Sequence, residues 1–254
     1  MIPKTRAKYP ITVERDYYRV LRAVLRKIKS SALDGLKQRN DSQAEDILTT
    51  IKEIYYASGT AEATAKELRR IYDGVDRVTR DNIQRVFEEF MASVDISADI
   101  DIWDEWEYMQ KTLIKDVEDS FFSKLAVLIG MGVLMGSTTS ESVVEQCYTS
   151  LDKRIKGIAK DQTGRLYGAV TRVYHEQCGI ECYLWQTRKD DKVRKSHRDK
   201  DGKLFYWSKK EMGEIDGHKI YPAQEFAPGE EYGCRCSAVA VLNIPDAIRF
   251  TQKD

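Results

Sequence analysis

Residues 166–187 read LYGAVTRVYHEQCGIECYLWQT, and the chain changes character within them. Before Gly179, apolar residues recur every three or four positions, which is typical of a helix. Residues 180–187 instead alternate and are rich in strand-forming types, and a glycine between two such patterns commonly ends the helix. The sequence therefore predicts a mainly α fold, in which a helical region of residues 1–178 precedes a small α+β module of residues 179–254.

Helical periodicity continues from this stretch back to the N-terminus. No proline occurs between Pro10 and Pro222, so no proline interrupts a helix in that span. Ser42 and Glu45 have the spacing of a capping box and predict a helix start. An acidic linker is expected at residues 93–101, a break at 136–139, and buried helices over 103–178. The predicted helices cover residues 12–37, 42–56, 60–90, 103–135 and 140–177.

Turn-forming residues divide the C-terminal module into short strands. Asp201-Gly202 is a turn signal, and Leu204–Trp207 behind it is expected to form a strand. Glycine and proline pairs then mark a loop that leads to Cys234. The apolar run 238–242 is the last expected strand.

The charges balance overall but are unevenly distributed along the chain. There are 41 Lys and Arg residues and 41 Asp and Glu residues. Residues 1–40 carry a net charge of +8, residues 41–120 a net charge of −11 and residues 121–254 a net charge of +3. Such asymmetry can steer partners toward complementary surfaces. Solvated helix faces without a partner explain it equally well.

Composition excludes several broad classes. With 42% hydrophobic and 32% charged residues, the chain is expected to be a soluble globular protein. Its longest apolar run, Leu125–Met135, has 11 residues, whereas a membrane-spanning helix needs about 20. The first residues lack the apolar core of a signal peptide. The five cysteines are expected to be reduced thiols in a cytosolic setting.

Two cysteines and a histidine form a candidate metal site. Cys234 and Cys236 are two apart in an extended segment, so their side chains point to one face. Thiolates at this spacing suit a soft or borderline metal such as zinc, with His197 as a nitrogen ligand. Asp190, His218 or water is the candidate fourth ligand.

Two alternatives to that site stay open. Cys178 and Cys182 are one helical turn apart and could complete a different site with the C-terminal cysteine pair. The cysteines of that pair can also be small buried residues that bind no metal, beside a histidine that makes ordinary hydrogen bonds.

A basic segment is a candidate contact for nucleic acid. Residues 188–210 hold ten basic and four acidic side chains, with three aromatic residues near the end of the segment. Such a mixture can bind phosphate and stack bases, and we select Arg194, Lys195 and Arg198 as candidate phosphate contacts. No motif for reading base sequence is present, so binding would be independent of sequence. A solvated loop, and a first helix docked on the acidic residues 41–120, explain the same charges without DNA.

The same region permits an enzymatic interpretation, which we do not favour. His197, Asp199 and Asp201 lie within five residues, next to Arg194 and Arg198, as in a metal-dependent nuclease. Zinc deaminases need H-x-E and P-C-x-x-C, neither of which occurs here. The chain also has no G-x-S-x-G, no H-E-x-x-H and no P-loop. We therefore predict no catalytic residue.

The order of motifs in the module is more specific than any one of them. The ordered residues are Trp185, Thr187, Asp190, Val193-Arg194, His197, Asp201-Gly202, Phe205, Pro228-Gly229 and Cys234-Arg235-Cys236. This order resembles the Mu F-like head morphogenesis family, the minor head proteins of tailed bacteriophages and prophages. The match extends over residues 183–239, and the helix before it fits the usual lead-in of the family. Lys192, where arginine is common, and the insert of residues 208–221 depart from the pattern.

The resemblance implies a structural role in the phage. It implies a minor head protein inside the virion head, made in the host cytoplasm, which binds the portal protein and capsid or scaffolding proteins. It also implies a role in head assembly that extends to packaging or ejection of phage DNA. In this module we expect Trp185 and Phe205 in the core, and Arg194 either paired with Asp190 or bound to phosphate. The alternative is a metal-dependent nucleic-acid-processing enzyme or toxin-like module that uses His197.

Overall fold

The computed structural model describes residues 2–37, 44–90, 92, 94, 96, 102–135 and 140–242. These residues form six helices, one of them a single turn, and five short strands, which confirms the mainly α fold with a small α+β module. The predicted helix bounds are confirmed to within two residues. The helices are α1 (Ile11–Lys37), α2 (Ala44–Tyr56), α3 (Thr60–Glu89), α4 (Trp103–Met135), α5 (Ser140–Gln177) and α6 (Lys195–Arg198).

Three of the sequence predictions fall wholly or partly outside the described residues. These are the capping position Ser42, most of the linker at 93–101 and the break at 136–139.

The described residues belong to two compact units, and neither is one continuous segment. The first unit comprises the ranges Met1–Ile11, Asp73–Ile102 and Asp161–Asp254, and the second comprises Thr12–Tyr72 and Trp103–Lys160. Both α3 and α5 therefore contribute residues to each unit. The proposed division into residues 1–178 and 179–254 stays a prediction. Its boundary differs from the boundaries between the two units, because residue 178 lies within the first unit.

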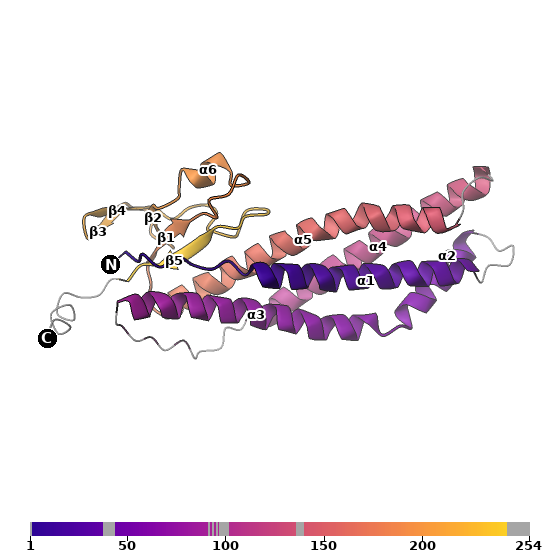
Figure 1. Ribbon diagram of the computed structural model, residues 1–254, viewed down its shortest axis with the longest axis horizontal. Helices are drawn as coiled ribbons and strands as arrows, with labels where there is room; N and C mark the ends of the chain where they lie inside the picture. The colour runs from indigo at the N-terminus through magenta and orange to yellow at the C-terminus, as the bar shows by residue number, and fades with distance from the viewer. Residues whose placement is uncertain are drawn as a thin grey trace. The chain divides into compact units, whose positions relative to one another are not determined.

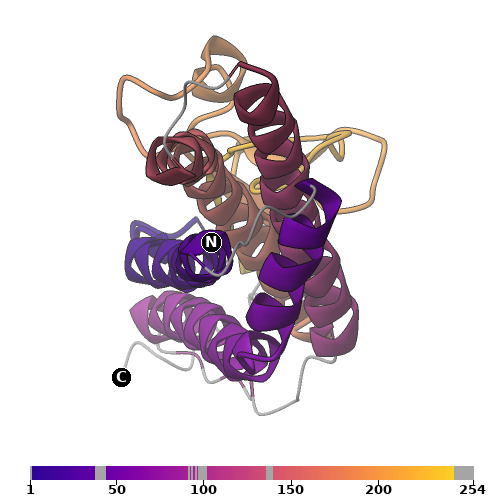
Figure 2. The ribbon, with the colours of Figure 1, turned by 90° about the vertical axis from the view of Figure 1, so that its right-hand side faces the viewer.

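The second unit is all-helical, and one face of α1 lies in its core. Tyr17, Leu25 and Ile28 occur at helical spacing on one face of α1 and are fully buried. Against this face, the Tyr17 hydroxyl donates a hydrogen bond to Gln110 of α4, and the Tyr17 ring packs 6.2 Å from that of Trp106. The helices of this unit lie alongside one another in Figure 1, and Figure 2 shows α1 nearly end-on.

Cations on the other face of α1 meet carboxylates of α5 within this unit. Arg22 Nε lies 3.1 Å from Asp152 Oδ1, and the Tyr18 hydroxyl donates to the same carboxylate at 3.1 Å. Lys29 forms an ion pair with Glu145. These two carboxylates lie outside the acidic residues 41–120, on which the sequence suggested that α1 could dock.

The first unit contains a five-stranded sheet in the order β3-β4-β2-β1-β5, shown with α6 in Figure 1. Strand β1 pairs antiparallel with both β2 and β5, while the central strand β2 pairs parallel with β4. Register places Trp185 opposite Ala238 and Tyr183 opposite Phe205. The strands are β1 (Cys182–Gln186), β2 (Leu204–Tyr206), β3 (Gly213–Ile215), β4 (His218–Tyr221) and β5 (Ser237–Ala240).

Alternation along β1 gives this sheet two apolar faces. Tyr183 and Trp185 point to one face, where they join a buried cluster that contains Phe205 and both cysteines of the C-R-C motif. Cys182 and Leu184 lie in clusters on the other side of the strand. The expectation that Trp185 and Phe205 belong to the core is confirmed, because their exposed fractions are 1% and 3%.

The segment 208–221, treated above as an insert, forms a β-hairpin that we did not predict. Asp216 and Gly217 have φ angles of 51° and 76°, and positive φ at both central residues defines the tight turn that joins β3 to β4. The Asp-Gly pair was therefore a valid hairpin signal. The flanking strands lack an apolar alternation, since His218 and Lys219 are both exposed.

Gly179 ends α5 as predicted. It has a φ of 67°, and the Ile180 amide donates to the His175 carbonyl at 2.8 Å, as in a Schellman motif. None of the described helices combines the length and the apolar character that a membrane crossing requires.

Candidate metal centre

His197 lies on α6, the single helical turn that follows β1. The turn is closed by the amides of His197 and Arg198, which donate to the Arg194 carbonyl at 3.1 and 3.0 Å. The imidazole is buried, and its ring stands edge-on to the indole of Trp185 with 5.5 Å between ring centroids. Strand β1 thus supplies the side chain against which this histidine packs.

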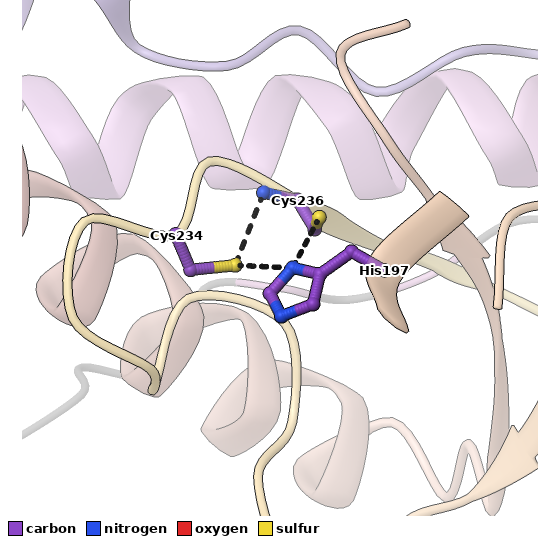
Figure 3. Close-up of side chains that lie close together, drawn as sticks. All are labelled: His197, Cys234 and Cys236. Atoms are coloured by element: carbon purple, nitrogen blue, oxygen red, sulfur yellow. Dashed lines mark hydrogen bonds between the residues drawn. The ribbon is translucent and has the colours of Figure 1, made fainter. Parts of the chain in front are cut away.

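Both cysteines of the C-R-C motif face one nitrogen of this histidine. Nδ1 of His197 lies 3.6 Å from Sγ of Cys234 and 3.4 Å from Sγ of Cys236 (Figure 3). The three potential ligand atoms lie within 4.8 Å of one another, and all three residues are buried. The structure therefore brings together the trio selected from the sequence. Metal binding by the trio stays a prediction.

The other imidazole nitrogen is held by a residue that the sequence analysis missed. Nε2 of His197 contacts the Glu231 carboxylate, which also lies 3.5 Å from Arg194. Glu231 stands in the loop between Pro228-Gly229 and Cys234, beside another glutamate, and nothing in the sequence distinguishes the two. Hydrogen bonds to Cys234 and Glu231 raise the pKa of His197, although burial acts to lower it.

The two thiols shift each other's pKa in opposite directions. A hydrogen bond from Cys236 lowers the pKa of Cys234, and His197 adds to that effect. The same interaction, together with burial, raises the pKa of Cys236. The amides of Gly229 and Cys236 also donate to the Cys234 sulfur, each at 3.4 Å. The Cys234 sulfur is therefore in a setting that favours a thiolate.

An ion pair fixes the C-R-C segment to the loop after β1. Arg235 donates to Asp190 at 2.7 Å, and its side chain is only 14% exposed. The second carboxylate oxygen of Asp190 accepts a hydrogen bond from the Lys192 amide at 3.1 Å. Asp190 was expected to pair with Arg194 or to serve as a fourth metal ligand. Instead Asp190 forms its ion pair with Arg235, and Arg194 lies at the surface beside Glu231.

The Asp-Gly turn is tied back to the end of β1. Oδ1 of Asp201 accepts hydrogen bonds from the amide and the hydroxyl of Thr187, at 2.7 and 3.0 Å. Gly202 has a φ of 78°, a conformation that favours glycine, and its amide donates to the Trp185 carbonyl at 2.8 Å. The motif residues Thr187, Asp201 and Gly202 thus form one turn that positions α6 and its histidine.

Two glycines of α5 allow the loop of the C-R-C motif to approach closely. A β-carbon at Gly164 would lie 2.4 Å from the carbonyl oxygen of Cys234, and one at Gly168 would lie 2.5 Å from that of Pro228. The loop is also held by Asp161, whose carboxylate accepts a hydrogen bond from the Gly233 amide at 2.6 Å. Helix α5 is therefore part of the support for the site.

The remaining candidate metal ligands do not reach the trio. Within the described residues, His197, Cys234 and Cys236 form the one group of three or more metal-binding side chains close enough to share an ion. His218 is exposed on β4, and Cys178 and Cys182 line a different cavity of about 440 Å³. The alternative site with four cysteines is therefore not formed.

The acidic residues of the enzymatic interpretation do not converge on the histidine either. Asp199 is exposed at the end of α6, and Asp201 is engaged by Thr187. Neither carboxylate belongs to the group of potential ligands around His197 among the described residues. Among the described residues, Asp199 and Asp201 therefore do not supply His197 with the paired acidic ligands that a metal-dependent nuclease would use.

One of the candidate phosphate contacts, Arg194, lines a small cavity next to the trio. This cavity has a volume of about 30 Å³ and adjoins all three trio residues. Arg194, Lys195 and Arg198 are all exposed. Arg198 commits its Nε to the Val193 carbonyl at 2.8 Å. The cationic side chains that line the cavity are Arg188, Lys192, Arg194 and Arg235.

Comparison with known proteins finds the same family that the order of motifs resembles. The family described as "Phage Mu protein F like protein" matches residues 109–239, about half of the chain. A protein of Haemophilus influenzae, described as uncharacterized, is 29% identical over 133 residues, which are 52% of this chain. The chain spans only 27% of that relative's length. No solved structure matches the chain. The matched residues contain α5, the sheet and the His197–Cys234–Cys236 trio, and the chain therefore belongs to the Phage Mu F-like family of phage head morphogenesis proteins.

Proposed function

We propose that the protein is a minor head protein that lies inside the phage head, is associated with the portal, and acts by binding rather than by turnover. Its role in this proposal is head assembly, extended to packaging or ejection of DNA. Its partners are the portal protein and capsid or scaffolding proteins. Synthesis and assembly take place in the host cytoplasm. Family membership supports this proposal, and so does the way in which the motif residues are used.

The single observation that carries the binding role is that the motif residues are engaged with one another. Thr187 holds Asp201, and Asp190 holds Arg235. His197 turns one nitrogen toward two sulfurs and the other toward Glu231. A general base needs a nitrogen free to take a proton from a substrate, and here both nitrogens are engaged. The motif is therefore suited to holding the module together.

In this proposal, DNA is contacted through exposed cations of the module. Arg194, Lys195 and Arg198 are exposed on or next to α6, where a phosphate backbone can reach them. Contacts of this type are independent of base sequence and weaken steeply as salt rises. Binding of duplex DNA by the purified chain at low and high salt measures them. We expect a Lys195→Ala/Arg198→Ala variant to bind more weakly and to show a smaller salt slope.

A matched control uses two exposed cations on helices outside the module. Arg70 and Lys111 have side chains that are 75% and 57% exposed. An Arg70→Ala/Lys111→Ala variant is expected to bind DNA as the parent chain does. Equal losses in both variants would mean that the affinity reflects charge in general, and would contradict a phosphate contact at α6.

The experiment that tests the head-protein role is quantitative mass spectrometry of purified procapsids and virions. The amount of this chain is compared with the amounts of portal protein and major capsid protein. We expect a low and reproducible ratio in both particles. Absence from both particles would contradict the proposal, and nuclease activity that His197→Ala abolishes would favour the enzymatic alternative.

A further inference from the structure

We propose that Nδ1 of His197 and the sulfur atoms of Cys234 and Cys236 bind one zinc ion, whose fourth position is occupied by water in the adjoining cavity. This site is independent of the head-protein role, because it rests on distances and contacts within the module. A chain absent from virions could still bind zinc, and a virion component could lack it.

The two distances from the histidine nitrogen to the sulfurs are those of a tetrahedral site. Zinc binds imidazole nitrogen at about 2.0–2.1 Å and thiolate sulfur at about 2.3 Å, so a tetrahedral angle places nitrogen and sulfur about 3.5 Å apart. The observed distances from Nδ1 to the two sulfurs are 3.6 and 3.4 Å. Each of these distances therefore allows one ion to contact the nitrogen and that sulfur together.

The surroundings of the trio support ligation at the atoms that face the site. A histidine that binds metal through one nitrogen usually donates from the other to a carboxylate, which fixes the ring and its tautomer. Glu231 is in this position at Nε2 of His197. Two backbone amides also donate to the Cys234 sulfur at 3.4 Å, and such donors favour a charged thiolate over a neutral thiol.

An unpartnered polar atom lies in the same buried cluster. The indole Nε1 of Trp185 is buried without a hydrogen-bond partner among the described residues. Trp185 packs in one cluster with Cys234 and Cys236, and its ring stands against His197. A buried donor without a partner is costly, and metal-bound thiolates are better hydrogen-bond acceptors than neutral thiols.

The ligand types select the metal. Two thiolates and one imidazole suit zinc, whereas magnesium and calcium prefer oxygen ligands. Asp190 does not complete the set, because Arg235 and the Lys192 amide engage its two oxygens. The cavity beside the trio measures about 30 Å³, which is more than the about 10–15 Å³ that one water molecule needs. The fourth position is therefore assigned to water.

The first test is the metal content of the full chain, purified after growth with zinc. We expect about one zinc per chain, and loss of that zinc in Cys234→Ser, Cys236→Ser and His197→Gln. Cys182→Ser is the matched control, because Cys182 is also buried but lines another cavity. Zinc retained by all three trio variants, or a folded parent chain that neither contains nor takes up zinc, would overturn the proposal.

A second measurement needs no variant, so loss of folding in the variants cannot obscure the result. In the zinc-loaded parent chain, Cys234 and Cys236 are expected to resist alkylation until a chelator is added, as mapped by peptide mass. The buried thiol of Cys147 is the internal reference, and a chelator is expected to leave its reaction rate unchanged. Equal reaction of the trio cysteines with and without chelator would overturn the proposal.

Cobalt substitution tests the ligand set and the open position. Cobalt in the site is expected to show thiolate-to-metal absorption and the visible bands of tetrahedral coordination. Added thiocyanate is expected to change these bands, because it can replace water in a cavity lined by Arg188, Arg194 and other cations. Bands that thiocyanate leaves unchanged would overturn the assignment of water to the fourth position.

Discussion

Asp190 and Arg235 form an ion pair of 2.7 Å that joins the loop after β1 to the centre of the C-R-C motif. The pair holds the cysteines on either side of Arg235 within reach of His197. The aspartate and the arginine of the family pattern are therefore partners, although 45 residues separate them in the chain. Both side chains are at least two-thirds buried, so loss of one partner leaves a charge that water only partly solvates.

Substitution of Asp190 should destabilise the module. We expect Asp190→Asn to lower the free energy of unfolding by about 1–3 kcal/mol, since the buried guanidinium loses its charged partner. Urea unfolding measures the change. The neighbouring Asp191 is exposed, and Asp191→Asn is expected to change stability by less than about 0.5 kcal/mol. Equal effects of the two substitutions would contradict a specific role for the pair.

At position 168, in the middle of α5, glycine is expected to give a more stable protein than alanine. A β-carbon at Gly168 would lie 2.5 Å from the Pro228 carbonyl oxygen, so Gly168→Ala must displace backbone at a cost of about 1–3 kcal/mol. Gly130 of α4 has open space at the same position. There alanine is expected to stabilise by about 0.5–1 kcal/mol through helix propensity. Thermal unfolding compares the two, and stabilisation by both substitutions would show that the loop does not pack on α5.

His175 should make stability depend on pH in the acidic range. Burial lowers its pKa to about 3, and its Nδ1 accepts a hydrogen bond from the Trp207 indole at 3.2 Å. The unfolded chain binds a proton below pH about 6.5 while the folded chain does not. Stability contributed by this residue is therefore full above pH 6.5 and falls as pH decreases toward 3.

The corresponding measurement is urea unfolding of the parent chain and His175→Gln from pH 7 to pH 4. Between about pH 6 and pH 4 the parent is expected to lose about 1.4 kcal/mol more per pH unit than the variant, because one additional proton is taken up on unfolding. Contributions from other groups cancel in the difference. Parallel pH profiles would mean that His175 is protonated in the folded chain.

Glu231 should influence the affinity for zinc without being a ligand. We expect Glu231→Gln to weaken zinc binding about 10- to 100-fold, since carboxylate partners of metal-binding histidines commonly contribute this much. Competition with a chromophoric chelator measures the affinity. Glu225 is exposed, and Glu225→Gln is the control that should leave it unchanged. An unchanged affinity in Glu231→Gln would contradict the assignment of Nδ1 as the ligand nitrogen.

The helices could be predicted from the sequence because their signals are local. Apolar periodicity, the absence of proline and Gly179 place the ends of α4 and α5 correctly. The strands β3 and β4 escaped prediction because they have three and four residues and largely exposed side chains. A short strand of this kind is stabilised by its neighbours in the sheet rather than by its own pattern.

The sequence predicted the potential metal ligands of the candidate site. It did not predict which residues pair with Asp190 and His197. In an extended segment, C-x-C spacing places two sulfurs on one face, and this geometry needs only the local backbone. The choice of Arg235 over Arg194 as partner of Asp190 depends on how the loops meet in space. The choice of Glu231 as partner of His197 has the same origin. Neither choice leaves a local signal in the sequence.

The central claim is that this chain is a portal-associated component of the phage head. The most direct measurement is its copy number, by quantitative mass spectrometry, in particles assembled with and without the portal protein. We predict a constant low ratio to the major capsid protein when the portal is present, and loss of the chain when the portal is omitted. A chain found in neither type of particle, or found equally in both, would contradict the account.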